Sequence, residues 1–222
     1  MLLKKLSKRD TTTKLKALAE LRAKLKERGA EWAAEFLPHW TLCFGRLATD
    51  ISWQVRDQTC GALAALAGLV GRQLATQLKQ LITPWLCCKC DPQHDVRRSA
   101  DAAFAAAFPN ATKFGEVLLF CREELVRSLA ERALAPPPAK SADKDEAAEA
   151  TEEHERCVGT ALRAIAALLD GVPAKAAATQ LEPLLEPHLP SLWPLGGAKA
   201  PSVRAALFAL CLALLKAVPE LA

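Results

Sequence analysis

The amino-acid sequence predicts an all-α fold of stacked helical hairpins, a helical repeat solenoid of the HEAT or armadillo type. The 222 residues are 51% hydrophobic but only 5% aromatic and lack tyrosine, and alanine and leucine supply most of the apolar content. Both favour helices, and no run of β-branched residues alternates as a strand would. An Asp-x-x-x-x-Val-Arg element also recurs after 41 residues, and HEAT and armadillo units repeat about every 40 to 47 residues.

Helix caps and breakers divide the first half of the chain into segments of about 15 to 20 residues. Thr11-Thr12-Thr13 can cap the first helix, and Gly29 can end it because glycine accepts a left-handed conformation. Pro38 bends or restarts the second helix, and Pro84 stands in the fourth. The expected helices cover residues 11–28, 31–49, 53–70, 74–88 and 96–108.

The repeated element predicts which residues hold neighbouring hairpins together. Asp50 with Val55-Arg56 and Asp91 with Val96-Arg97 have the same internal spacing. We expect the aspartate to cap the incoming helix, the valine to pack against the preceding hairpin, and the arginine to reach back to acceptors in a neighbouring unit. The residues assigned to repeat stacking are Asp50, Arg56, Asp91 and Arg97. The alternative is that a two-residue sequence pattern recurs by chance.

A third copy, Val203-Arg204, lacks the aspartate and follows Val96-Arg97 by 107 residues, or two periods of 41 plus 25. The surplus is close to the length of segment 135–156, which contains a proline run and carries seven acidic against three basic residues. Such a composition favours disorder over a packed core. We therefore expect HEAT repeats with a leading basic arm in 1–134, a disordered acidic insertion in 135–156, and further, truncated HEAT-type helices in 157–222.

The start of the chain is strongly basic. Its first 28 residues carry ten lysines and arginines against three acids, although the whole chain has a net charge of only +4. Five of these cations precede or open the first helix, namely Lys4, Lys5, Lys8, Arg9 and Lys14. Lysine and arginine release counterions when they neutralise phosphates, and a helix start also favours phosphate. This basic arm is the candidate binding site for RNA or an acidic partner, and a merely solvated helix end is the alternative.

No catalytic or metal-binding constellation is found in the sequence. Cys87, Cys90 and His94 have the spacing of metal ligands, but a structural zinc site needs four ligands and no second pair follows. The end of a buried helix explains these cysteines without a metal. The four histidines have no nucleophile at a recognisable spacing, and no phosphate-binding or nucleophile-elbow motif occurs. We expect no catalytic residue, no metal site and no cofactor in this chain.

The sequence predicts a cytosolic protein that does not span a membrane. Most of the eight cysteines sit in apolar helical patterns, where reduced cysteines act as small hydrophobes. The N-terminus has no apolar stretch suited to a signal peptide, although its basic, threonine-rich composition leaves a transit peptide as an alternative. The longest apolar run, residues 205–215, is shorter than the roughly 20 residues that cross a bilayer.

The basic arm lies in a stretch that resembles the N-terminal motif of the listerin family, the large RING-type E3 ubiquitin ligases of ribosome-associated quality control. The stretch reads LKKLSKRDTTTKLKA over residues 3–17. Further agreements, in order, are LPHW at 37–40, LATD at 47–50 with Val55-Arg56, WL at 85–86 with Cys90-Asp91, DAAF at 101–104, AFP at 107–109 and FCREEL at 120–125. The resemblance covers roughly residues 2–129 and fades beyond the acidic segment.

The resemblance implies a long HEAT/armadillo arch whose N-terminal end docks on the 60S subunit of a stalled, split ribosome and meets the nuclear export mediator factor. On this basis the basic arm would contact ribosomal RNA or the partner factor. The resemblance also implies a zinc-bound RING at the far C-terminal end, which recruits a ubiquitin-conjugating enzyme to modify the nascent chain.

The chain departs from the complete family pattern in two ways. No RING ligand set occurs in it, and it begins at the basic motif, where family members usually carry a preceding segment. We therefore expect part of a longer protein, such as an incomplete gene model, with no ligase activity in this piece. The competing hypothesis is a standalone, non-catalytic HEAT adaptor that binds acidic protein or RNA partners.

Overall fold

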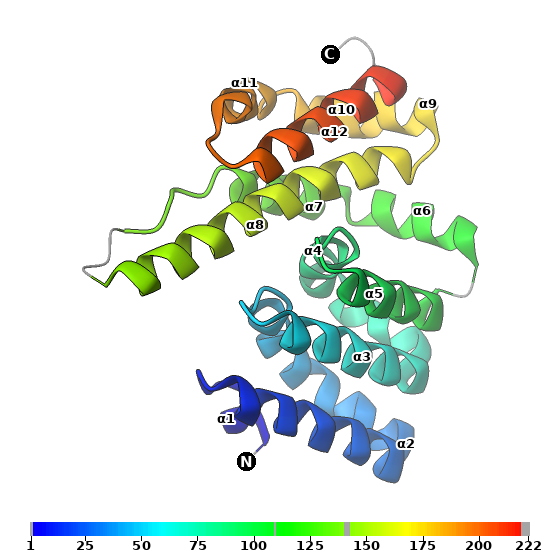
Figure 1. The fold of residues 1–222 in the computed structure, drawn as a ribbon. Helices are drawn as coiled ribbons and strands as arrows, with labels where there is room; N and C mark the ends of the chain where they lie inside the picture. Colours follow the sequence, from blue (N-terminus) through cyan, green and yellow to red (C-terminus); the bar gives the residue numbers. More distant parts are fainter. Residues whose placement is uncertain (1, 109, 140–142, 219–222) are drawn as a thin grey trace. The chain divides into compact units, whose positions relative to one another are not determined.

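The structure, a computed structural model, describes residues 2–108, 110–139 and 143–218, and these residues form helices and turns with no strand among them (Figure 1). The all-α prediction is confirmed. The chain divides into two compact units, Met1–Lys113 and Phe114–Ala222, whereas the sequence suggested boundaries after residues 134 and 156. Pro109 and residues 140–142, which belong to the resemblance and to the expected insertion, lie outside the described residues.

The first unit consists of helices stacked one on the next. Its elements are α1 (Leu2–Leu6), α2 (Thr11–Ala48), α3 (Trp53–Val70), a 3-10 helix (Gly71–Gln77), α4 (Leu78–Lys89) and α5 (His94–Ala107). α1 packs on α2, α2 packs on α3, and α3 packs on α5. Figure 1 shows this order in the change from blue through cyan to green. Stacking of each hairpin on its neighbour is the arrangement of helical-repeat proteins.

Two helical segments of α2 meet at Gly29, where φ is 70° and ψ is −159°. This backbone conformation is essentially restricted to glycine, so the predicted break at Gly29 is confirmed, although no loop separates the two segments. The start of α2 differs from the expectation. Asp10 is the N-cap, and its carboxylate accepts a hydrogen bond from the amide of Thr13 at 2.6 Å. Asp10 has the extended backbone of a cap, whereas the three threonines are already helical.

Two tryptophans anchor the core of the first unit. Trp40 of α2 and Trp85 of α4 are completely buried. Trp85 stacks on Phe104 of α5 with ring centroids 4.0 Å apart, and its Nε1 donates to the carbonyl of Ala100 at 3.2 Å. Aromatic side chains of this size each remove about 150–250 Å² from water. The ring stack and the hydrogen bond therefore determine how α4 meets α5.

The second unit is centred on the long helix α8 (Lys144–Asp170), which packs against α7 (Arg122–Ala133) and α12 (Pro201–Ala217). Because α7 packs on α8, residues 114–134 belong with the later helices and not with the first repeats. α6 (Ala111–Phe120) crosses the boundary between the units. The remaining short elements are α9 (Ala174–Ala176), a π-helix (Ala177–Leu181), α10 (Glu182–Leu185), α11 (Leu189–Leu192) and a 3-10 helix (Trp193–Gly197).

Among the described residues, no single helix is both long and apolar enough to cross a bilayer. One pair, α8 with Ala174–Leu185, meets the length and composition criteria only when its two arms are taken together, and this pair is bent by 116° at the break between them.

The expected disordered insertion does not hold for residues 144–156, which form the first half of α8. Asp143 caps this half, because its carboxylate accepts hydrogen bonds from the amides of Asp145 at 2.9 Å and Glu146 at 3.3 Å. Alanine and glutamate favour a helix, and acids at its start interact well with the helix dipole. The second half of α8, which is largely buried, supplies a nucleus from which the exposed half can extend.

Candidate docking surface on the first unit

The three copies of the repeated element share one local geometry. In each copy, Nη1 of the arginine donates to the carbonyl oxygens five and six residues before it. These distances are 3.0 and 2.7 Å for Arg56, 2.7 and 2.7 Å for Arg97, and 2.8 and 2.6 Å for Arg204. Val55, Val96 and Val203 are all buried. The third copy therefore adopts the same loop-closing geometry even though Ala198 stands where the other two copies have aspartate.

Ion pairs join successive hairpins of the first unit into a ladder. Lys14 Nζ donates to the Asp50 carboxylate at 2.5 Å. Arg56 donates from Nε and Nη2 to both oxygens of Asp91, at 2.7 and 3.0 Å, and both side chains are 2% exposed. A fork-like pair of this kind combines charge with fixed geometry. Arg56 therefore reaches forward to the next hairpin, and the expected direction, back toward the preceding one, was wrong.

The aspartates of the ladder do not cap the incoming helices in the expected way. Asp50 accepts a hydrogen bond from the amide of Ser52 at 3.0 Å, and Asp91 accepts one from the amide of Gln93 at 2.9 Å. Ser52 and Gln93 are the N-cap residues, and neither uses its side chain for the cap. Each aspartate lies two residues earlier and fixes the turn, so that its carboxylate can also receive the cation of the preceding hairpin.

Lys14 belongs to this ladder and not to the surface of the basic arm. It stands 42 residues before Arg56, and its side chain is only 13% exposed because it is held against Asp50. The sequence alone predicts Lys14 as an RNA-binding candidate, because it is basic and close to the other cations of the arm. The 42-residue spacing was the signal that could have identified it as the first member of the repeat.

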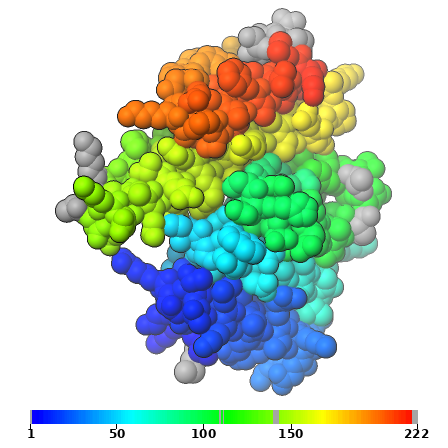
Figure 2. Space-filling view, in the orientation of Figure 1, coloured from blue at the N-terminus to red at the C-terminus, as the bar shows by residue number. Residues whose placement is uncertain are grey.

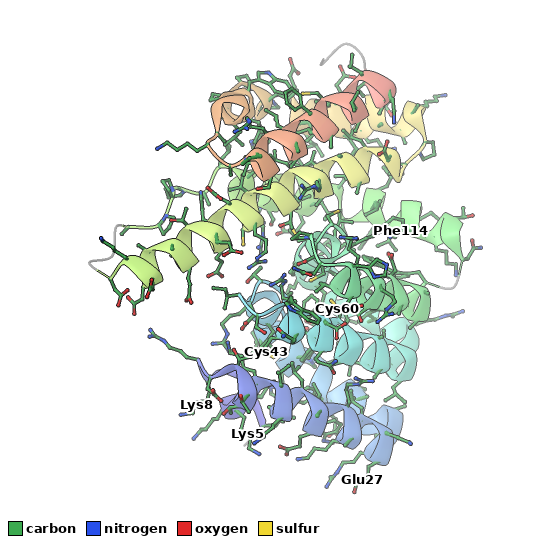
Figure 3. The ribbon with its side chains drawn as sticks, in the orientation of Figure 1. Lys5, Lys8, Glu27, Cys43, Cys60 and Phe114 are labelled. Atoms are coloured by element: carbon green, nitrogen blue, oxygen red, sulfur yellow. The ribbon has the colours of Figure 1, made fainter. Side chains whose placement is uncertain are left out.

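The rest of the basic arm lies at the surface. Lys4, Lys8 and Arg9 are exposed and form no ion pair with any other residue in 2–108, 110–139 or 143–218. Lys5 pairs with Glu20 at 2.8 Å while remaining 41% exposed. The pKa of Glu20 is held below its usual value by the hydrogen bond from Lys5 and then by Lys24. Figure 3 labels Lys5 and Lys8 at the N-terminal end of the first unit, and Figure 2 shows the corresponding blue surface.

Arg46 fastens the arm to the end of α2. Its Nη2 donates to the carbonyl of Leu6 at 3.3 Å and to Oγ of Ser7 at 3.0 Å. Leu2 and Leu6, from the same segment, are buried against the unit. The arm is therefore a docked segment with a defined position. Nothing in the spacing of the sequence connects Arg46 with Ser7, so this contact could not be found without the structure.

An open hollow of about 360 Å³ lies beside the break in α2, and it is lined by Glu27, Arg28, Glu31, Trp32 and Glu35. Trp32 stacks on Phe36 with centroids 5.0 Å apart. The lining contains carboxylates, a guanidinium and an indole but no histidine, serine or cysteine.

The cysteine-rich end of α4 does not fit a zinc ion. Cys87 is buried, Cys90 is half-buried at the end of the helix, and the His94 side chain is 76% exposed. In the part of the chain that the structure describes, no three histidine, cysteine, aspartate or glutamate side chains gather as a ligand set. The buried thiols behave as core groups: burial raises the pKa of Cys43 to about 11, and a hydrogen bond between the Cys88 and Cys60 thiols, together with burial, raises the pKa of Cys88.

A stack of hairpins tied by buried ion pairs, with a docked basic segment at its start, defines a helical-repeat scaffold. Residues 1–222 match the family model described as the N-terminal domain of E3 ubiquitin-protein ligase listerin. The chain belongs to the listerin family. It is 34% identical to listerin of Gallus gallus over 229 residues, which cover 100% of this chain, and 34% identical to listerin of Mus musculus over 227 residues, which cover 99%.

The chain corresponds to a small part of these relatives, since the aligned region is 13% of the listerins of both species. Among solved structures, it is similar to a designed armadillo repeat protein, YIII(Dq)4CqI, with a TM-score of 0.45 and 19% identity over 94% of this chain and 98% of that one.

Proposed function

We propose that this chain is the ribosome- and partner-docking portion of a listerin-type E3 ubiquitin ligase that modifies stalled nascent chains on 60S subunits. The exposed cations of the docked arm carry the proposal. Lys4, Lys8 and Arg9 project from a segment that Arg46 and two buried leucines hold in place. Such a segment loses less conformational freedom on meeting RNA phosphates than a disordered tail would.

Family membership supports the other parts of the proposal. The second partner would be the nuclear export mediator factor, and the site of action would be the cytosol. The zinc-bound RING and the ubiquitin-conjugating enzyme that it recruits would lie outside these residues. On this proposal, the chain positions the ligase on the ribosome, and the transfer of ubiquitin takes place elsewhere in the protein.

Co-sedimentation with purified 60S subunits tests the proposal. The chain should sediment with 60S particles at about 0.05 M salt and progressively less toward about 0.2 M salt. Replacing Lys4, Lys8 and Arg9 with alanine should release most of the bound chain at the lower salt. The matched control removes the same charge from the far end of the first segment of α2, through Arg22→Ala, Lys26→Ala and Arg28→Ala, and should bind as the unchanged chain does.

Two outcomes would contradict the proposal. If neither the unchanged chain nor the control triple variant sediments with 60S particles at low salt, ribosome docking fails and the non-catalytic adaptor becomes the better hypothesis. If both triple variants weaken binding equally, the contact is a general effect of positive charge and does not belong to the arm.

A further inference from the structure

We propose that Ser7 is a phosphorylation site for a serine/threonine kinase that recognises basic residues ahead of the serine, and that Arg46 holds the phosphate once it is attached. Ser7 is exposed directly after α1, with Lys4 and Lys5 three and two residues before it. The effect on ribosome binding rests on the proposed function above. The modification itself and its structural effect do not.

The surroundings of the Ser7 hydroxyl suit a phosphate. Its Oγ donates to the carbonyl of Leu3 at 3.0 Å and accepts a hydrogen bond from Nη2 of Arg46 at 3.0 Å. Arg46 comes from 39 residues away and also donates to the carbonyl of Leu6. A guanidinium has five donor hydrogens in a planar fork that matches phosphate oxygens. Phosphorylation would replace one neutral acceptor beside this guanidinium with three strong, negatively charged ones.

A kinase can reach Ser7 through a local opening of α1. This helix has only five residues, too few to be stable by itself. Leu2 and Leu6, together with the contact to Arg46, keep it docked. In the reaction, Oγ of Ser7 attacks the γ-phosphorus of Mg-ATP, the bond from that phosphorus to the β–γ bridging oxygen breaks, ADP leaves, and the hydroxyl proton passes to the kinase base.

Ser99 provides a comparison within the same chain. It follows two arginines, Arg97 and Arg98, so its neighbours are also basic. Its Oγ, however, donates to the Asp57 carboxylate at 2.5 Å, and a phosphate at that position would face a like charge. Arg97 is occupied by the loop carbonyls before it. The structure therefore favours modification of Ser7 over Ser99.

Phosphorylation of Ser7 would change the first unit in two opposite ways. A phosphoserine adds a charge of about −1.5 to −2 beside Lys4, Lys8 and Arg9. The arm would then release fewer counterions on binding RNA, which weakens binding on the order of ten-fold at about 0.15 M salt. At the same time, the charge-assisted bonds from Arg46 would hold α1 more firmly on α2.

In the test, the whole chain is incubated with Mg-ATP and a purified serine/threonine kinase that prefers basic residues before its target serine. The product is then analysed by mass spectrometry. We expect one phosphate on Ser7, which is lost in Ser7→Ala and also in the Lys4→Ala, Lys5→Ala double variant that retains the serine. The phosphorylated chain should melt roughly 2–5 °C higher than the unmodified chain, and this increase should be absent in Arg46→Leu. Its binding to 60S subunits should weaken as stated above.

Each measurement can overturn one part of the proposal. Absence of phosphate on Ser7, or equal labelling of Ser99, contradicts the assigned site. If phosphorylation raises the melting temperature of the unchanged chain no more than it raises that of Arg46→Leu, the role of Arg46 is contradicted. Unchanged 60S binding after phosphorylation contradicts the proposal that phosphorylation of Ser7 weakens ribosome binding. Failure of the unmodified chain to bind 60S subunits is a different result, because it removes the proposed function while the labelling and melting experiments still decide the site.

Discussion

At the residue scale, one basic side chain of the first unit, Arg56, has two roles. Arg56 uses Nη1 to close its own loop and the other edge of the guanidinium to bind Asp91 of the next hairpin. Lys14 makes the corresponding pair with Asp50 but has a single nitrogen, so it can bind the neighbour without closing a loop. The residues of the Asp-Val-Arg element that hold the hairpins together could therefore be predicted from the sequence. The direction in which Arg56 reaches, toward the next hairpin, could not.

Removing one side of the buried pair should be costly. Arg56→Leu leaves the Asp91 carboxylate buried without its cation, which should lower the free energy of unfolding by about 3–5 kcal/mol. The double variant Arg56→Leu, Asp91→Leu should recover much of this loss, because no lone charge remains buried. Urea denaturation measures both variants.

An exposed pair in the same unit serves as the control. Arg98 lies 3.1 Å from Asp95 with its side chain 70% exposed, so Arg98→Ala should cost no more than about 1 kcal/mol. Equal losses for Arg56→Leu and Arg98→Ala would contradict the structural role given to the ladder.

Burial should make the thiol of Cys43 slow to react. Its pKa is raised from 9.0 to about 11, mainly because burial penalises the thiolate. At pH 8 the thiolate fraction is then about 100-fold lower than in the unfolded chain. The raised pKa also means that Cys43 stabilises the fold below pH 9 and that this contribution declines as the pH rises from 9 to about 11.

Alkylation by iodoacetamide, followed by mass spectrometry of the Cys43 peptide, measures this reactivity. We expect labelling at pH 8 to be at least about 100-fold slower in the native chain than in urea. A comparable rate in the two conditions would show that the thiol is accessible in the native chain.

At the element scale, helix ends that depend on one residue could be predicted, and those that depend on packing could not. Gly29 ends a helical segment through its own backbone conformation, which no neighbour needs to impose. The first half of α8 is different, because its acidic residues resemble a disordered linker until the buried half is known to extend into them. The irregular segment between α8 and α12 likewise depends on prolines and local packing that show no helical period.

Gly29→Ala should destabilise the first unit. A φ of 70° combined with a ψ of −159° strains a residue with a Cβ by about 1–3 kcal/mol. Gly68, an exposed glycine inside α3 with nothing within 4 Å of an added Cβ, is the control, and Gly68→Ala should stabilise by about 0.5–1 kcal/mol. Thermal melting of the two variants should shift in opposite directions, and a shift in the same direction would argue against a break at Gly29.

Helix α12 has a buried and an exposed apolar face. Leu210 is completely buried, whereas Phe208, Leu212 and Leu215 are 63%, 59% and 56% exposed. Leu210→Ala should therefore cost about 2–5 kcal/mol by leaving a cavity, and Leu212→Ala should change the stability by less than about 0.5 kcal/mol. A large loss from Leu212→Ala in urea denaturation would mean that this face is covered in the folded chain.

At the scale of the whole molecule, the sequence predicted the class of fold and the family but not the details of the candidate surface. Periodic spacing and alanine–leucine composition are properties of the chain itself, so the helical repeats followed from them. Whether a lysine faces solvent depends on a partner many residues away. Lys14 was assigned to the surface although Asp50 holds it in the ladder, and the fastening of Ser7 by Arg46 had no counterpart in the sequence.

The salt dependence of binding to purified 60S subunits tests the central claim most directly. The logarithm of the binding constant should fall linearly with the logarithm of salt concentration, and removing Lys4, Lys8 and Arg9 should reduce the slope by about 2–3, since each phosphate contact contributes about 0.7–0.9. Lys14→Met, which removes a charge already bound to Asp50, should leave the slope unchanged. A slope that stays the same without the three exposed cations, or that falls when Lys14 is replaced, would contradict the assignment of the docking surface.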